Sequence, residues 1–90
     1  MDFSEALTQI KKGMRLAREG WNGKGLFIFL VNGSRFTVNR EPLLSILGEG
    51  TEVSYNPHID VRRTDGSIST WSPSNDDVLA DDWVLVSDRS

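Results

Sequence analysis

The chain has 90 residues, of which 38% are hydrophobic and 26% charged, and its formal net charge is −3. This length supports one small core and a single domain over residues 1–90, and the apolar content is too high for a disordered chain. The acidic balance argues against nonspecific binding to duplex DNA, which requires a broad basic face. Because a core of this size gives marginal stability, self-association is expected.

Cysteine is absent, which excludes a disulfide framework, a thiolate zinc site and a catalytic thiol. The first residues lack the basic region and apolar stretch of a signal peptide. The longest apolar run, residues 26–31, is far shorter than the roughly 20 residues of a membrane span. We therefore expect a cytoplasmic protein.

Positive charge is concentrated in the first part of the chain. Residues 1–40 carry seven Lys or Arg against three acids, whereas residues 41–90 carry three against ten. A compact anionic ligand needs only a few cations, and the first part offers Arg15, Arg18, Lys24, Arg35 and Arg40.

The first predicted element is an amphipathic helix over residues 3–12. Asp2 and Glu5 have the spacing of a capping box, and apolar residues follow at helical spacing. Gly13 is a stop signal. The apolar stripe of such a helix is expected to pack on a sheet.

Short strands with turn signals follow the helix. We predict strands over residues 14–18 and 26–31, with Asn32-Gly33 making a hairpin turn to a strand over residues 36–38. Residues 26–31 are apolar on both faces of the predicted strand. They therefore need cover on both sides, from the helix on one and from another subunit on the other.

The second half continues the same pattern. Residues 39–50 are predicted to form a loop with a short helical turn that begins at Pro42 and ends at Gly48. Further strands are predicted over residues 51–55, 58–63, 67–71 and 83–86, with a hairpin turn at Asp65-Gly66. The order predicts an α+β fold: an N-terminal helix packed on a mainly antiparallel β-sheet, with a short helix before the last strand.

Catalytic and metal-binding patterns are missing from the sequence. His58 is the single histidine, and Asp60, two residues away on the same strand face, does not make a catalytic spacing with it. The cluster Asp76, Asp77, Asp81 and Asp82 lacks the spacing of a calcium loop. We expect the first pair to stabilise a helix N-terminus and the second pair to lie in solvent. The sequence therefore predicts a protein that is not an enzyme and that binds neither a cofactor nor a metal.

Two tryptophans have the surroundings of ring-stacking platforms. Trp21 stands among glycines and charged residues, which suits a binding site better than a core. Trp71 precedes Ser74 and Asp77, which have capping-box spacing for a short helix to about residue 80, and a core role and a site role fit it equally. Trp83 lies in an apolar strand and is expected in the core.

Several phrases together identify a family resemblance over nearly the whole chain. They are residues 3–7, 17–25, 36–40, 57–60 and 77–83, the second reading Ala17-Arg18-Glu19-Gly20-Trp21-Asn22-Gly23-Lys24-Gly25. The chain resembles the phage and prophage family of Thoeris anti-defence proteins of the second type. The resemblance implies a homotetrameric sponge that sequesters a cyclic ADP-ribose isomer without cleaving it, in pockets between subunits. It also implies that cyclic dinucleotides of CBASS-type signalling can bind at a separate site.

The resemblance also implies a set of ligand-binding residues. Trp21 and Trp71 would be the ring platforms, and Arg18 would pair with the pyrophosphate. The residues that would read ribose hydroxyls or adenine edges are Asn22, Asn39, Ser74 and Asp77. Thr70 and Asn75 depart from the Pro and Gln expected at these positions, and this leaves ligand preference open.

Two other classes of function remain open from the sequence. A hydrolase of nucleotide messengers would use His58 or the aspartates. A protein-interaction module would use the apolar strand and Trp21 to block a host protein directly.

Overall fold

The structure is a computed structural model that describes residues 1–21 and 25–86. Its three helices are α1 (Phe3–Lys11), α2 (Leu43–Leu47) and α3 (Asn75–Leu79). Its strands are β1 (Leu16–Arg18), β2 (Phe27–Val31), β3 (Ser34–Thr37), β4 (Glu52–Tyr55), β5 (His58–Arg62), β6 (Ile68–Thr70) and β7 (Trp83–Leu85). In the described part of the chain, no helix is long and apolar enough to cross a membrane.

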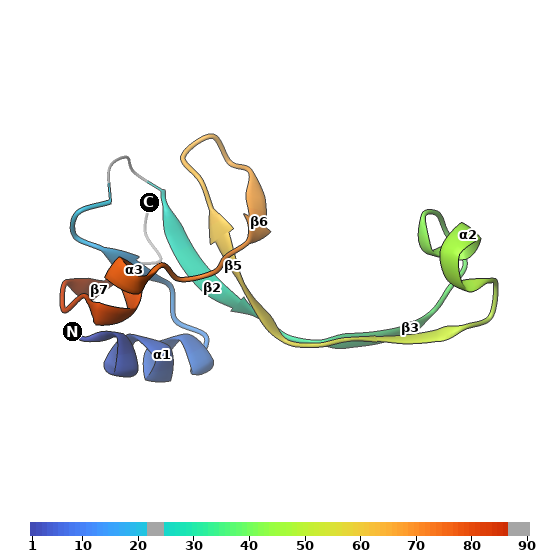
Figure 1. Cartoon of the computed structure of the whole chain (residues 1–90), viewed down its shortest axis with the longest axis horizontal. Helices are drawn as coiled ribbons and strands as arrows, with labels where there is room; N and C mark the ends of the chain where they lie inside the picture. Colours follow the sequence, from blue (N-terminus) through green and yellow to red (C-terminus); the bar gives the residue numbers. More distant parts are fainter. Residues whose placement is uncertain (22–24, 87–90) are drawn as a thin grey trace.

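Five of these strands form one antiparallel sheet in the order β6-β5-β2-β1-β7. Helix α1 packs on this sheet, and α3 precedes the last strand, as Figure 1 shows. The predicted α+β fold is therefore confirmed. We call the five-stranded sheet with α1 and α3 the body.

Strands β3 and β4 form a separate two-stranded ribbon that projects from the body and carries α2 at its far end (Figure 1). We call residues 34–55 the arm. The arm makes the molecule elongated, with extents of 46 × 27 × 26 Å.

The predicted hairpin at Asn32-Gly33 is wrong. Strand β2 pairs with β5, β3 pairs with β4, and the chain runs straight on from the body into the arm. A Cβ atom at Gly33 would overlap the carbonyl oxygen of Tyr55 and lie 3.2 Å from Pro57 Cδ. Glycine at this position therefore permits the close approach of the returning chain and does not make a turn.

Helix α1 begins as its capping residues predict. The Asp2 side chain accepts a hydrogen bond of 2.8 Å from the Glu5 N–H, and Ala6 and Ile10 are fully buried on the face toward the sheet. The core of the body consists of Ala6, Ile10, Leu16, Ile28, Val61 and Trp83. The predicted core position of Trp83 is confirmed.

The two faces of β2 have different surroundings. Ile28 is fully buried in the core, and strand alternation places Phe27 and Phe29 on the opposite face. The predicted cover from the helix on one face is confirmed. Cover of the other face by a second subunit stays a prediction.

The remaining local signals also appear in the structure. Helix α2 follows Pro42 and ends at Gly48, and β5 and β6 are joined through the Asp65-Gly66 turn, where Gly66 has φ 88°. The Asp65 side chain accepts hydrogen bonds from Ser67, which lower the pKa of that carboxyl. Such turns favour glycine because φ is positive.

Candidate functional site

Three tryptophans meet on one side of the body. Trp83 is fully buried, and the ring of Trp21 stands edge-on to it at 5.4 Å with an interplanar angle of 78°. The ring of Trp71 approaches the same residue at 6.0 Å and 87°. Trp21 and Trp71 are both partly buried and pack against the core cluster. Although the sequence around Trp21 is rich in glycine, the ring of Trp21 therefore packs against the core.

Arg18 links these tryptophans to two carboxylates. Its Nε donates to Asp82 Oδ1 at 2.9 Å, and its Nη1 donates to Asp77 Oδ1 at 3.0 Å. The three side chains are 24%, 29% and 14% exposed for Arg18, Asp82 and Asp77. The prediction that Asp82 lies in solvent is wrong, because Arg18 reaches it from a neighbouring strand of the sheet.

The charges of this cluster stabilise one another. Hydrogen bonds to Asp82 and then to Asp77 raise the pKa of Arg18 above its usual value. The bond from Arg18 lowers the pKa of Asp82. At Asp77, partial burial acts to raise the pKa, but hydrogen bonds from Ser74 and Arg18 outweigh it, and the pKa falls. All three groups are therefore ionised at neutral pH, with a formal sum of −1.

Asp77 connects helix α3 to the segments that carry Trp21 and Trp83. Its carboxylate and the Ser74 hydroxyl form the predicted capping box, in which Ser74 N donates to Asp77 Oδ2 at 2.9 Å and Asp77 N to Ser74 Oγ at 3.1 Å. Its backbone carbonyl accepts a bond of 3.0 Å from Trp83 Nε1. The Trp21 N–H in turn donates to the Arg18 carbonyl at 3.0 Å. One network thus holds the segments that carry Trp21 and Trp83 in position.

The structure brings together five of the seven predicted site residues, namely Arg18, Trp21, Trp71, Ser74 and Asp77. Asn22 lies outside the described residues. Asp82 was not among the predicted residues, and no local signal could have found it, because its partner Arg18 is 64 positions away in the sequence. We call the cluster of Arg18, Trp21, Trp71, Asp77 and Asp82 the tryptophan site.

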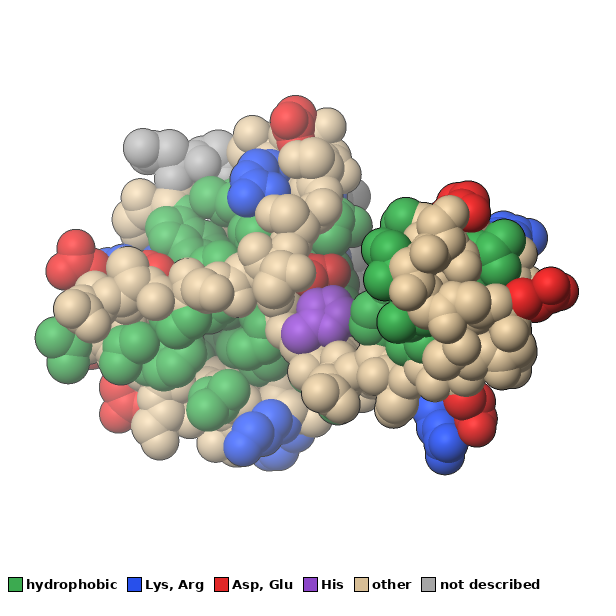
Figure 2. All heavy atoms as spheres, turned by 45° about the vertical axis from the view of Figure 1, so that its right-hand side comes forward, with side chains coloured by type: hydrophobic (Ala, Val, Ile, Leu, Met, Phe, Trp, Pro, Cys, Tyr) green, Lys and Arg blue, Asp and Glu red, His purple; other side chains and the backbone are tan. Residues whose placement is uncertain are grey.

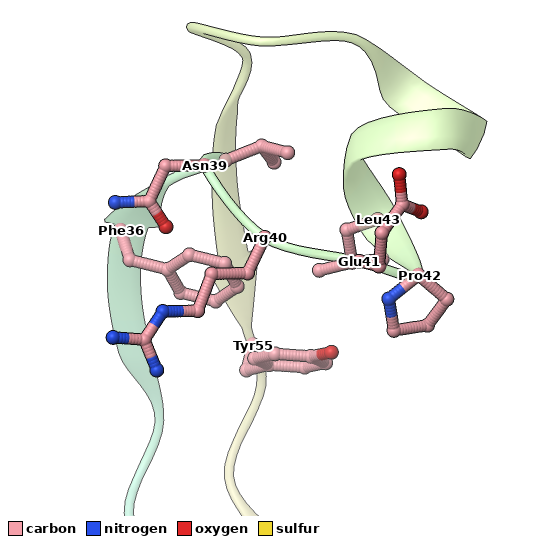
Figure 3. A pocket seen from close by; sticks show the side chains of 8 residues that line it. Phe36, Asn39, Arg40, Glu41, Pro42, Leu43 and Tyr55 are labelled. Carbon is pink, nitrogen blue, oxygen red and sulfur yellow. The ribbon is translucent and has the colours of Figure 1, made fainter.

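Asn39 lies elsewhere, on the arm. It lines a hollow of about 330 Å³ with Phe36, Arg40, Glu41 and Tyr55, seen from close by in Figure 3. The rings of Phe36 and Tyr55 are 5.4 Å apart and form one wall. A single protomer therefore does not join Asn39 to the tryptophan site, because the arm extends away from the body (Figure 1).

His58 lies where the body meets the arm, and its surface is visible in Figure 2. Its Nε2 is 3.4 Å from Asp60 Oδ1, and its Nδ1 is 3.1 Å from the Asn56 carbonyl oxygen. The expected sharing of one strand face by His58 and Asp60 is confirmed. Across residues 1–21 and 25–86, no three His, Asp or Glu side chains are grouped so that they could hold a metal ion.

Fold and site together define a small α+β domain, in which aromatic rings and a charged network meet around Trp83 and a largely apolar hollow lies on the arm. The chain belongs to the Tad2-like family, because the model of the Thoeris anti-defense 2-like domain matches residues 1–86. It is also 39% identical over 92 residues to "Thoeris anti-defense 2" of Bacillus phage SP01, covering 97% of this chain and 96% of that protein. The family resemblance drawn from the sequence is therefore confirmed, and family membership supports a phage role against Thoeris defence.

Proposed function

We propose that the chain is a phage anti-defence sponge. It binds a cyclic ADP-ribose-type immune messenger in the host cytoplasm, holds it without cleaving it and so keeps it from its effector. Cyclic dinucleotides are a further class of ligand for the same protein, which would extend its action from Thoeris to CBASS-type immunity. The observation that carries this proposal is the pair of half-buried rings, Trp21 and Trp71, held against one buried tryptophan beside a charged network.

The two rings suit a ligand that carries a nucleobase. Stacking of a base on an aromatic side chain contributes about 1–3 kcal/mol. Because contact with Trp83 already positions the Trp21 and Trp71 rings, little side-chain entropy is lost when a base binds. Prepositioned rings therefore favour the tight binding that sequestration requires.

The charged network suits the sugar and pyrophosphate parts of such a ligand. Arg18 has more N–H donors than its bonds to Asp77 and Asp82 use, so it can also donate to a phosphate oxygen. The carboxylate of Asp77 and the hydroxyl of Ser74 can accept hydrogen bonds from ribose hydroxyls. The excess of one carboxylate opposes an anion, so the site needs another cation.

The arm of a second copy can supply this cation. Asn39 is followed by Arg40 at the arm hollow, far from the tryptophan site of its own chain. In a homotetramer with pockets between subunits, the arm of one copy would bring Asn39 and Arg40 to the tryptophan site of another. The arrangement explains why predicted site residues lie on two separate parts of one protomer.

The first experiment measures the melting temperature of the purified protein with a panel of cyclic ADP-ribose isomers and cyclic dinucleotides. At a ligand concentration of a hundred times Kd, binding stabilises the protein by about 2.7 kcal/mol. For a domain of this size that corresponds to a rise of roughly 10 °C or more. After heating, the recovered ligand should have an unchanged mass.

Two substitutions at one position test the site. Trp21→Ala should abolish the ligand-induced shift, whereas Trp21→Phe should keep most of it, because a ring remains for stacking. Each shift is measured against the variant's own melting temperature without ligand, so that lost packing on Trp83 does not count as lost binding. Altered ligand mass would make the protein a hydrolase, and no shift with any compound would favour a module that blocks a host protein.

A further inference from the structure

The sheet face opposite α1 carries a second hollow. It has a volume of about 320 Å³, and its lining includes Arg15, Phe27, Phe29, Arg62 and Ile68. Phe27 and Phe29 alternate along β2 with the buried Ile28, so this hollow and the core lie on opposite faces of the sheet. We call it the arginine groove. It shares no residue with the tryptophan site.

Two guanidinium groups lie over one ring in this groove. The Cζ of Arg15 is 5.0 Å from the centre of the Phe27 ring, and the Cζ of Arg62 is 5.8 Å from it. Both distances are within the range of cation–π contact. The ring of Phe29 lies 5.9 Å from that of Phe27, and Ile68 is 56% exposed at the groove. Positive charge and open apolar surface are therefore adjacent.

A hydrogen bond to a backbone carbonyl holds the Arg62 side chain in place. Its Nη1 donates to the carbonyl oxygen of Gly25 at 3.0 Å. Gly25 has φ 87°, which favours glycine, and a Cβ atom there would overlap Arg62 Nη1, so a larger residue would displace the end of the Arg62 side chain. Within residues 1–21 and 25–86, no Asp or Glu forms an ion pair with Arg62. A half-buried cation is thus held in place by a neutral group.

We propose that the arginine groove binds a small amphiphilic anion, a flat apolar body that carries one oxyanion. The oxyanion accepts hydrogen bonds from Arg62, and the apolar body covers Phe29 and Ile68. The oxyanion thereby gives the half-buried Arg62 an anionic partner. The oxyanion alone would leave the apolar wall of the groove uncovered. The apolar part of the ligand alone would leave Arg62 without an anion.

Three probes test the oxyanion and the apolar part of the proposed ligand separately. 8-Anilinonaphthalene-1-sulfonate has both, N-phenyl-1-naphthylamine has the apolar body alone, and inorganic phosphate has the oxyanion alone. Titrated into the full-length protein and followed by fluorescence, the sulfonate should bind saturably. The uncharged amine should bind at least about tenfold more weakly, since it lacks a charge-assisted hydrogen bond. Phosphate should displace the sulfonate only at a far higher concentration.

Arg62→Gln and Arg63→Gln form a matched pair of variants. Arg63 is exposed and donates to Ser69 Oγ. Its substitution therefore removes the same positive charge, but from a position outside the groove. Arg62→Gln should weaken sulfonate binding about tenfold with the amine unaffected, and Arg63→Gln should change neither. Near-ultraviolet circular dichroism checks that both variants stay folded. The proposal is overturned by equal binding of sulfonate and amine, by equal loss in both variants, or by absence of saturable binding.

Discussion

The body and the arm differ in how their apolar residues are used. Six of the seven buried apolar residues in the described part of the chain lie in the body, and Val38 is the arm's single one. The arm exposes Ile46 at 69% and Tyr55 at 51%, and the body exposes Leu79 at 83% and Ile68 at 56%. A two-stranded ribbon is at best marginally stable by itself in water. The body therefore has a core of its own, whereas the arm has a single buried apolar residue among those described.

This difference matches the proposed division of the ligand site. The tryptophan site lies on the body, where packing holds the rings rigidly, and Asn39 lies on the arm. If arms of other copies complete the site, the exposed apolar surface of the arm is covered in the assembly. Stability and assembly are then carried by different parts of one short chain.

The largest expected effect is the loss of Trp83 from the body. Its ring contacts Phe3, Trp21 and Trp71, and it is fully buried, so Trp83→Ala should destabilise the protein by about 3–5 kcal/mol. The matched change in the arm, Tyr55→Ala, should cost less than about 1 kcal/mol, because half of that side chain is already exposed. Urea unfolding measures both. Similar costs for the two variants would show that the arm contributes to the core as much as the body does.

The sequence predicts best where a structure depends on neighbouring residues. The capping residues of α1 and α3, the ends of α2 and the Asp65-Gly66 turn all use groups a few positions apart, and all are present. Each is set by local backbone chemistry, so one sequence is enough to find it.

The errors concern pairings between distant residues. Asn32-Gly33 has the composition of a hairpin turn, but the strand that pairs with β2 begins at His58, and Gly33 serves the close passage of Tyr55. Asp82 looks solvent-exposed in the sequence until the sheet places it beside Arg18. Likewise, nothing local shows that Trp21 rests on Trp83. These contacts depend on the order of strands in the sheet, which alternation and turn signals do not determine.

A smaller effect is expected from the charges that connect α3 to β1. In the folded body the pKa values of Asp82 and Asp77 are lowered, so below the ordinary aspartate pKa of about 3.9 the unfolded state binds more protons. The stabilising contribution is therefore present above that pKa and is lost as the pH falls through the lowered folded values. The melting temperature should therefore fall as the pH drops below about 4.

Substitutions separate this effect from the titration of other acids. Asp82→Asn should make the acid-dependent fall in melting temperature shallower, because one of the two carboxylates paired with Arg18 no longer titrates. Asp81→Asn removes the same charge from a neighbouring exposed residue and should keep the slope of the parent protein. Equal slopes in all three proteins would mean that the Arg18 network does not govern acid stability.

The smallest effect on stability is expected from removing the arm altogether. Val31 and His58 face each other in the sheet, so residues 32–57 can be replaced by Asn-Gly, the preferred two-residue hairpin connection. The core, the β2–β5 ladder and the three tryptophans are all retained, so the near-ultraviolet circular dichroism and the melting temperature should change little. Ligand-induced stabilisation should nevertheless disappear, because Asn39 and Arg40 are gone, and self-association should disappear with the exposed apolar surface of the arm. If the shortened chain fails to fold, the arm stabilises the body directly, and the separation of stability from assembly is wrong.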